Sequence, residues 1–160
     1  MHRTPPSRRG SKLGVTGAGS VILVVGRTKM SADAPHWGVA GVGNHGNIAA
    51  ELDEPIGREG PWDFELRGPR WGFRFEVTGP EAVRSLLAFV REHGTKPGYE
   101  SYQIAKSDEA EIEMAKTSDL GVRFELKVCG RHFTVCGTIQ DEDAVSLRKV
   151  LEDVVEDLDT

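Results

Sequence analysis

Residues 62–94 read WDFELRGPRWGFRFEVTGPEAVRSLLAFVREHG, and this stretch decides the fold. Apolar and charged side chains alternate from Trp62 to Arg67 and again from Phe73 to Val77. Such alternation is typical of strands that bury one face. Residues 68–70 (Gly-Pro-Arg) have the composition of a turn. The sequence therefore predicts a β-hairpin at the start of this stretch.

A helix is predicted directly after the hairpin. Thr78 and Glu81 have the spacing of a capping box, and Pro80 suits the first helical turn. Gly94 is a typical residue at a helix end. Between them, apolar residues recur at the spacing of one helical face: Val83, Leu86, Leu87 and Val90.

The same order of elements returns later in the chain. Residues 124–127 (FELK) repeat residues 64–67 (FELR), and residues 133–135 (FTV) repeat residues 73–75 (FRF) at the same offset. A second helix is expected from Asp141, because acidic residues favour the positive end of a helix dipole. Two further strands are expected before each hairpin: Trp37–Val42, Asn47–Leu52, Ser101–Ala105 and Glu111–Ala115.

We therefore predict an α+β fold in which antiparallel sheets and two helices form duplicated ββββα units packed into one domain. The domain is expected to span residues 20–160, with halves at about 36–94 and 99–158. This order of elements resembles the ββββα repeats of the Pur-type and Whirly single-stranded nucleic-acid-binding proteins. It also resembles small bacterial immunity proteins, which pack helices on a sheet. The resemblance covers element order only, and one fold can serve many functions.

The first 29 residues differ in charge from the rest of the chain. They hold six of the 20 basic residues and no acidic one, which leaves 14 basic residues against all 25 acidic ones. We predict a disordered basic arm over residues 1–19 and a strand, covered on both faces, over Ser20–Arg27. Two alternatives stay open: an export signal containing Arg8 and Arg9, and a leader that precedes a natural start at Met30.

Overall composition narrows the function classes. An acidic body argues against binding to duplex nucleic acid, which needs clustered Lys and Arg. Two cysteines are too few for a disulfide scaffold and fit the reducing cytoplasm. No apolar run approaches the ~20 residues that span a bilayer, so no membrane contact is predicted.

Residues 41–46 (GVGNHG) match the G-x-G-x-x-G pattern of dinucleotide-binding proteins. Pro55 follows too soon for the crossover helix that such a fold requires. We therefore interpret Asn44–Gly46 as a glycine-rich hairpin turn and predict no cofactor.

Cys129, His132 and Cys136 suggest metal or thiol chemistry. If Gly130 and Arg131 form a two-residue turn, Cys129 lies opposite His132, and Cys136 lies ~13 Å along the strand, too far for a disulfide with Cys129. One cysteine and one histidine make half of a zinc site, so no metal is predicted. A small thiol enzyme centred on Cys129 and His132 remains an alternative.

The candidate binding residues lie on the first hairpin. Single-strand binders stack bases on aromatic side chains beside a basic groove. Phe64, Phe73 and Phe75 fit the core pattern, which leaves an exposed set of one tryptophan and three arginines: Arg67, Arg70, Trp71 and Arg74.

Our leading hypothesis is a non-enzymatic module that holds a protein partner through a sheet face or a helix groove. A single-stranded nucleic-acid binder using the Trp62–Phe75 hairpin and the basic arm is the first alternative. No catalytic residue is predicted, and the sequence does not decide the oligomeric state.

Overall fold

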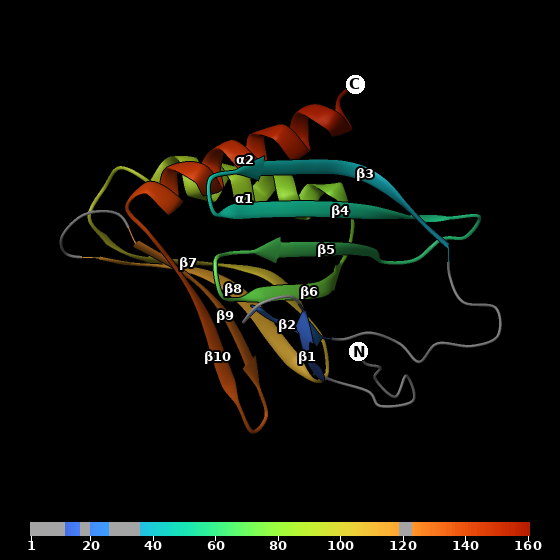
Figure 1. Ribbon diagram of the computed structural model, residues 1–160, viewed down its shortest axis with the longest axis horizontal. Coiled ribbons are helices and arrows are strands. Elements are labelled where there is room, and N and C mark those ends of the chain that lie inside the picture. The colour runs from blue at the N-terminus through green and yellow to red at the C-terminus, as the bar shows by residue number, and fades with distance from the viewer. Residues whose placement is uncertain (1–11, 17–19, 26–35, 119–122) are drawn as a thin grey trace.

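The computed structural model describes residues 12–16, 20–25, 36–118 and 123–160 and confirms the predicted α+β fold (Figure 1). Each predicted half, about residues 36–94 and 99–158, contains four strands followed by a helix, and two further strands precede the first half. The elements are β1 (Lys12–Thr16), β2 (Ser20–Val25), β3 (His36–His45), β4 (Ile48–Ile56), β5 (Trp62–Arg67), β6 (Gly72–Val77), α1 (Pro80–His93), β7 (Gly98–Lys106), β8 (Ala110–Ser118), β9 (Arg123–Gly130), β10 (Thr134–Gln140) and α2 (Glu142–Leu158).

The strands form two sheets. Strands β3 to β6 make an antiparallel meander, and β1 and β2 extend it to six strands in the order β1-β2-β6-β5-β4-β3. Strand β2 runs parallel to β6 and pairs Leu23 with Phe73, which the sequence did not predict. The second sheet is antiparallel, in the order β10-β9-β8-β7.

The N-terminal predictions have a mixed outcome. The strand expected at Ser20–Arg27 is present as β2. Lys12–Thr16, which we expected in a disordered arm, forms β1 instead. The rest of the arm and Met30 lie outside the described residues.

The first helix begins differently from the prediction. Its N-cap is Gly79, and no side chain caps the first turn. The expected capping box of Thr78 and Glu81 therefore does not form, because the helix starts one residue too late for Thr78 to be its cap. Pro80 does occupy the first helical position.

Helix α2 comes from the second unit but packs on β3 and β4 of the first (Figure 1). Glycines allow this close approach: a Cβ at Gly43 would overlap the carbonyl oxygen of Val150, and a Cβ at Gly41 would lie 2.7 Å from that of Val154. Gly46, with φ of 55°, lies in the β3–β4 turn. The G-x-G-x-x-G pattern is thus a helix-docking surface and a hairpin turn.

Polar contacts hold the same helix against β3. His45 Nε2 lies 2.8 Å from Asp153 Oδ2. The backbone N–H of Val42, at the sheet edge, donates to Asp157 Oδ2 at 3.0 Å. Helix α2 therefore both covers the face of the first sheet and satisfies part of its open edge.

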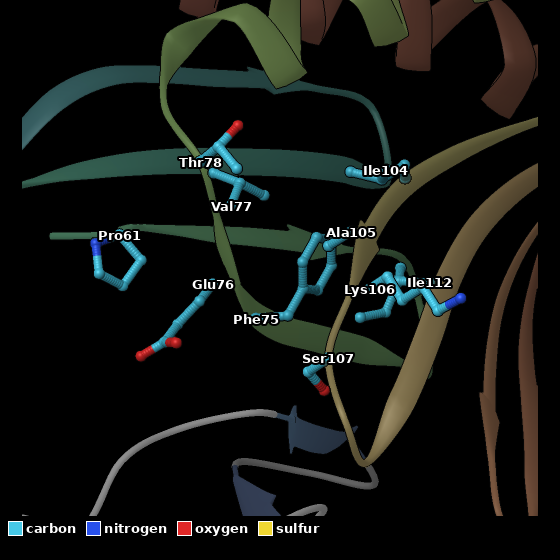
Figure 2. Close-up of a pocket in the computed structure, with 10 residues that line it drawn as sticks. All are labelled: Pro61, Phe75, Glu76, Val77, Thr78, Ile104, Ala105, Lys106, Ser107 and Ile112. Carbon is cyan, nitrogen blue, oxygen red and sulfur yellow. The ribbon is translucent and has the colours of Figure 1, made fainter.

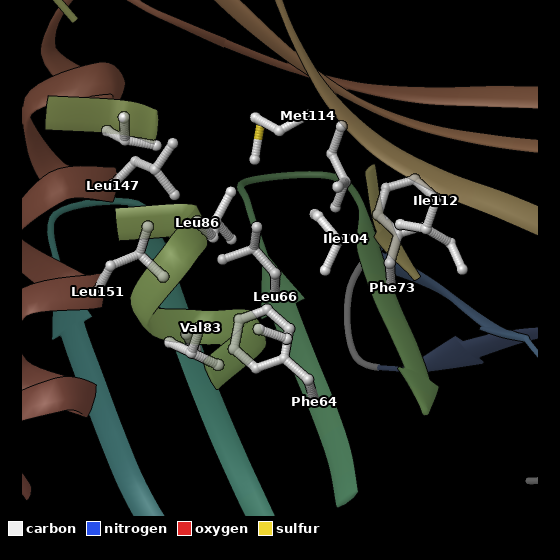
Figure 3. Packing of buried hydrophobic residues seen from close by; sticks show 14 of the residues in the cluster. Phe64, Leu66, Phe73, Val83, Leu86, Ile104, Ile112, Met114, Leu147 and Leu151 are labelled. Carbon is white, nitrogen blue, oxygen red and sulfur yellow. The ribbon is translucent and has the colours of Figure 1, made fainter. Parts of the chain in front are cut away.

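Both units share one hydrophobic core. In Figure 3, Phe64 and Leu66 of the first sheet point toward α1, while Leu147 and Leu151 of α2 approach from the other side. Met114 of the second sheet belongs to the same cluster. The rings of Phe64 and Phe75 meet edge to face, 5.7 Å apart.

Candidate functional site

Two of the three arginines predicted to bind a ligand, Arg67 and Arg74, are held by neighbouring carboxylates. Arg74 lies 2.8 Å from Glu65 Oε1 through Nη2 and 3.3 Å from Asp63 Oδ2 through Nε. Arg67 Nε lies 3.0 Å from Glu65 Oε2. Arg70 is exposed in the β5–β6 turn. The outer face of the first sheet therefore does not offer a free basic groove at this hairpin.

Trp71, which we predicted to be exposed, is half-buried between two glycines. A Cβ at Gly137 of β10 would lie 2.6 Å from the indole ring, and one at Gly68 would overlap it. The ring centroid also lies 5.6 Å from that of Phe73. Trp71 thus joins the β5–β6 turn to the second sheet, and this packing leaves it poorly placed to stack on a base.

Carboxylates dominate the outer face of the first sheet. Asp53 lies opposite Asp63, and the two residues are only 9% and 2% exposed. A hydrogen bond to Asp53 raises the pKa of Glu51 above that of a free carboxyl, and partial burial raises it further. Among the described residues, no group of His, Cys, Asp or Glu is arranged to hold a metal ion.

The raised pKa of Glu51 predicts a dependence of stability on pH. The folded state favours the protonated carboxyl, so this contribution to stability is full at low pH and is lost as pH rises through the folded pKa. Glu51→Gln should therefore stabilise the protein at pH 7 by roughly 0.5 kcal/mol, a modest value because the side chain is partly solvated. Urea unfolding at pH 4 and pH 7 measures the difference, which should shrink toward pH 4. Glu54→Gln, on the exposed end of the same strand, is the control; equal effects of the two substitutions would contradict the assignment.

The β9–β10 hairpin has a different register from the predicted one. Its turn consists of Arg131 and His132 and is closed by the N–H of Gly130, which donates to the carbonyl oxygen of Phe133 at 2.8 Å. Cys129 consequently lies opposite Thr134 rather than His132. Both cysteines are free, but the ~13 Å separation predicted between them depended on the register that the structure does not have. The thiol–imidazole pair on which a thiol enzyme would depend is not supported by this register.

Partial burial raises the pKa of the Cys136 thiol, and the nearby Glu125 carboxylate raises it further. A raised pKa leaves less thiolate at neutral pH, and the thiolate is the reactive form. In a Cys129→Ser background, Cys136 should therefore react with iodoacetamide at pH 7.5 more slowly than a cysteine in a short peptide. Mass spectrometry of timed samples measures the rate. A rate above that of the peptide would indicate an activated thiol.

Two pockets lie between elements of the described chain. One, of about 190 Å³, lies between β6 and the β7–β8 turn (Figure 2) and has neither a thiol nor an imidazole among its lining residues. Its Ser107 hydroxyl accepts hydrogen bonds from the N–H groups of Glu109 and Ala110, at 3.2 and 3.3 Å, so it is engaged in the turn. The second pocket lies between the end of α1 and the start of α2. There Arg91 and Arg148 both bind Glu152 Oε2, at 3.1 and 3.2 Å.

Strand β10 offers a different feature, an open sheet edge. It is the outermost strand of the second sheet. Because the N–H of Gly130 bonds to Phe133, the odd-numbered residues of β10 direct their backbone groups toward β9. The even-numbered residues direct their N–H and C=O groups away from the sheet, and all are exposed: Thr134, Cys136, Thr138 and Gln140.

Sheet edges are normally protected by charges, proline, bulges or a covering element. Strand β3 has a bulge between Val39 and Gly41 and is covered by α2, while β7 has a bulge between Gln103 and Ala105 and the charged residue Lys106. Strand β10 (TVCGTIQ) has no charge and no proline, and its register with β9 is unbroken. Among the edge strands whose side chains are described, β10 alone lacks these protections.

Sequence reasoning overlooked this edge, although a signal was present. Residues 133–140 (FTVCGTIQ) are uncharged and rich in β-branched side chains, between the basic Arg131 and the acidic Asp141.

No protein-family model matches the chain, no curated protein is detectably similar to it, and no solved structure matches it. Within the described segments, neither helix has the length and apolar character needed to cross a membrane.

Proposed function

We propose that the protein is a non-enzymatic binding module that accepts an extended segment of another polypeptide along β10. The single observation that carries this proposal is the unprotected edge of β10. It refines the expectation from sequence, since the binding element is a sheet edge rather than a sheet face or a helix groove. The two free cysteines fit a place of action in the reducing cytoplasm.

Strand addition suits the geometry of this edge. The four alternate residues that face outward present four N–H donors and four C=O acceptors along the edge. In strand addition, these backbone groups supply affinity and the alternating side chains supply specificity. Here Thr134, Cys136 and Thr138 would line one side of an added strand.

The alternatives have weaker support. A nucleic-acid surface at the β5–β6 hairpin would need Arg67 and Arg74 to leave the carboxylates of Asp63 and Glu65. A helix groove would need Arg91 and Arg148 to release Glu152. Free charges bind phosphate or carboxylate ligands without that cost.

A pair of substitutions at Thr138 tests the proposal. Thr138→Pro removes an N–H that has no partner in the folded chain, and proline is tolerated at such edge positions. Thr138→Val keeps the N–H and changes only the side chain. The probe is a library of random decapeptides displayed on phage and selected on the full-length protein.

Selected peptides should bind Thr138→Pro at least tenfold more weakly than they bind either the wild type or Thr138→Val, as measured by fluorescence polarisation. The melting temperature of each variant confirms that it is folded. Failure of the monomeric protein to enrich any peptide, or binding that is equally strong in Thr138→Pro, would overturn the proposal.

A further inference from the structure

We propose that the strand added to β10 is β10 of a second copy of this chain, paired antiparallel about Gly137. This inference rests on the proposed function, because it names the partner of the same edge. The symmetric pairing would join the two four-stranded sheets into one continuous sheet across a two-fold axis.

The backbone pattern of β10 fits this register. Centring the pair on Gly137 places Cys136 opposite Thr138 of the second copy, and Thr134 opposite Gln140. All four are residues whose N–H and C=O groups point outward, so each opposed pair can exchange two hydrogen bonds. The hydrogen bonds between the two copies then extend along the full length of β10.

Charge complementarity at the two ends of β10 favours a second copy as the partner. Arg131 and His132 precede the strand, while Asp141, Glu142 and Asp143 follow it. An antiparallel pair brings the basic turn of one copy beside the acidic start of α2 in the other. The arrangement repeats at the second junction because of the symmetry. A parallel pair would instead bring like charges together.

Side chains on both faces of the junction are compatible with this pairing. On the inner face, Val135, which is 38% exposed, would lie beside Ile139 of the second copy. The two copies of Gly137 would meet at the axis, each with Trp71 packed over it. On the outer face, neutral Cys136 and Thr138 separate the charged residues of the two sheets.

The size of the contact predicts a weak dimer. One pair of seven-residue strands buries less than the ~1,200–2,000 Å² of stable complexes. We therefore expect concentration-dependent association in the micromolar range or weaker. Analytical ultracentrifugation of the full-length protein from about 1 to 500 μM covers that range.

The sedimentation series includes four comparisons. Thr138→Pro should raise the dimer dissociation constant at least tenfold above that of Thr138→Val, which also changes the side chain but keeps the backbone N–H. Arg131→Glu should raise it several-fold, and adding Asp143→Arg should restore it, because the charges at each junction are exchanged. A dimer unaffected by Thr138→Pro, or no restoration by the charge exchange, would overturn the inference.

Disulfide trapping tests the register. In a Cys129→Ser background, Thr138→Cys would face Cys136 of the second copy at a Cα separation of about 5.5 Å, within the range of a disulfide. Mild oxidation should give at least tenfold more covalent dimer than in the matched control that also carries Cys136→Ser. Equal dimer yields would contradict this register.

Failure of the inference is distinguishable from failure of the proposed function. A monomer throughout the concentration range, together with proline-sensitive binding of selected peptides, would overturn the inference and leave β10 as a site for a different protein. A monomer that also selects no peptide would overturn both.

Discussion

Gly43→Val should lower the free energy of unfolding by about 3 kcal/mol or more. A side chain at Gly43 would overlap the carbonyl oxygen of Val150, so α2 could not keep its present distance from β3. Moving the helix would also separate Val154 and Leu151 from the core they help to form. Urea unfolding followed by circular dichroism measures the loss.

Gly79→Ala is the matched control for this substitution. No atom lies within 4 Å of a Cβ at Gly79, and its φ of 165° is extended backbone that any residue adopts. Its effect should stay within about 1 kcal/mol, because the only cost is the lower preference for alanine at the N-cap of α1. A loss below about 1 kcal/mol for Gly43→Val would show that the helix moves without cost and that the close approach is not required.

Trp71→Ala is the second large effect and should cost about 2–3 kcal/mol. Fully buried tryptophans lose about 3–5 kcal/mol on truncation, and the half-buried position of Trp71 lowers that figure. The loss follows from the cavity that would open between Gly137, Phe73 and the β5–β6 turn. Chemical unfolding measures it, and Trp71→Phe should recover part of the stability.

The same substitution separates a structural role from nucleic-acid binding. If Trp71 stacked on bases, truncation would leave stability almost unchanged and would abolish binding of a labelled single-stranded oligonucleotide. We expect the opposite result. Trp71→Ala should clearly lose stability, and the wild-type protein at micromolar concentration should show no salt-sensitive binding of the oligonucleotide.

Local patterns were enough to predict most elements of this fold. Alternation of apolar and charged residues identified both hairpins, and the helical stripe from Val83 to Val90 identified α1. The register of β9 against β10 could not be predicted in the same way. Moving the turn from residues 130–131 to residues 131–132 shifts β10 by two positions along β9. Because side chains alternate between the two faces, this shift leaves every side chain on the same face. Both turns therefore satisfy the apolar pattern equally well.

Long-range arrangements also escaped prediction. The parallel pairing of β2 with β6 has no signal in the local sequence, because the apolar run Val21–Val25 fits any covered strand. The role of Gly41 and Gly43 depends on α2, more than 100 residues away. The candidate residues Arg67 and Arg74 looked available because sequence alone does not show which carboxylates lie beside them.

The docking of α2 on β3 has a consequence for the order in which the chain can fold during synthesis. The bond from Val42 to Asp157 joins residues 115 positions apart, and α2 ends only at Leu158. A ribosome still holds the residues that it added most recently, so β3 stays uncovered until α2 has been synthesised and has left the ribosome. The native core is therefore completed only after Asp157 is available, and its formation should be slowed by this long loop closure.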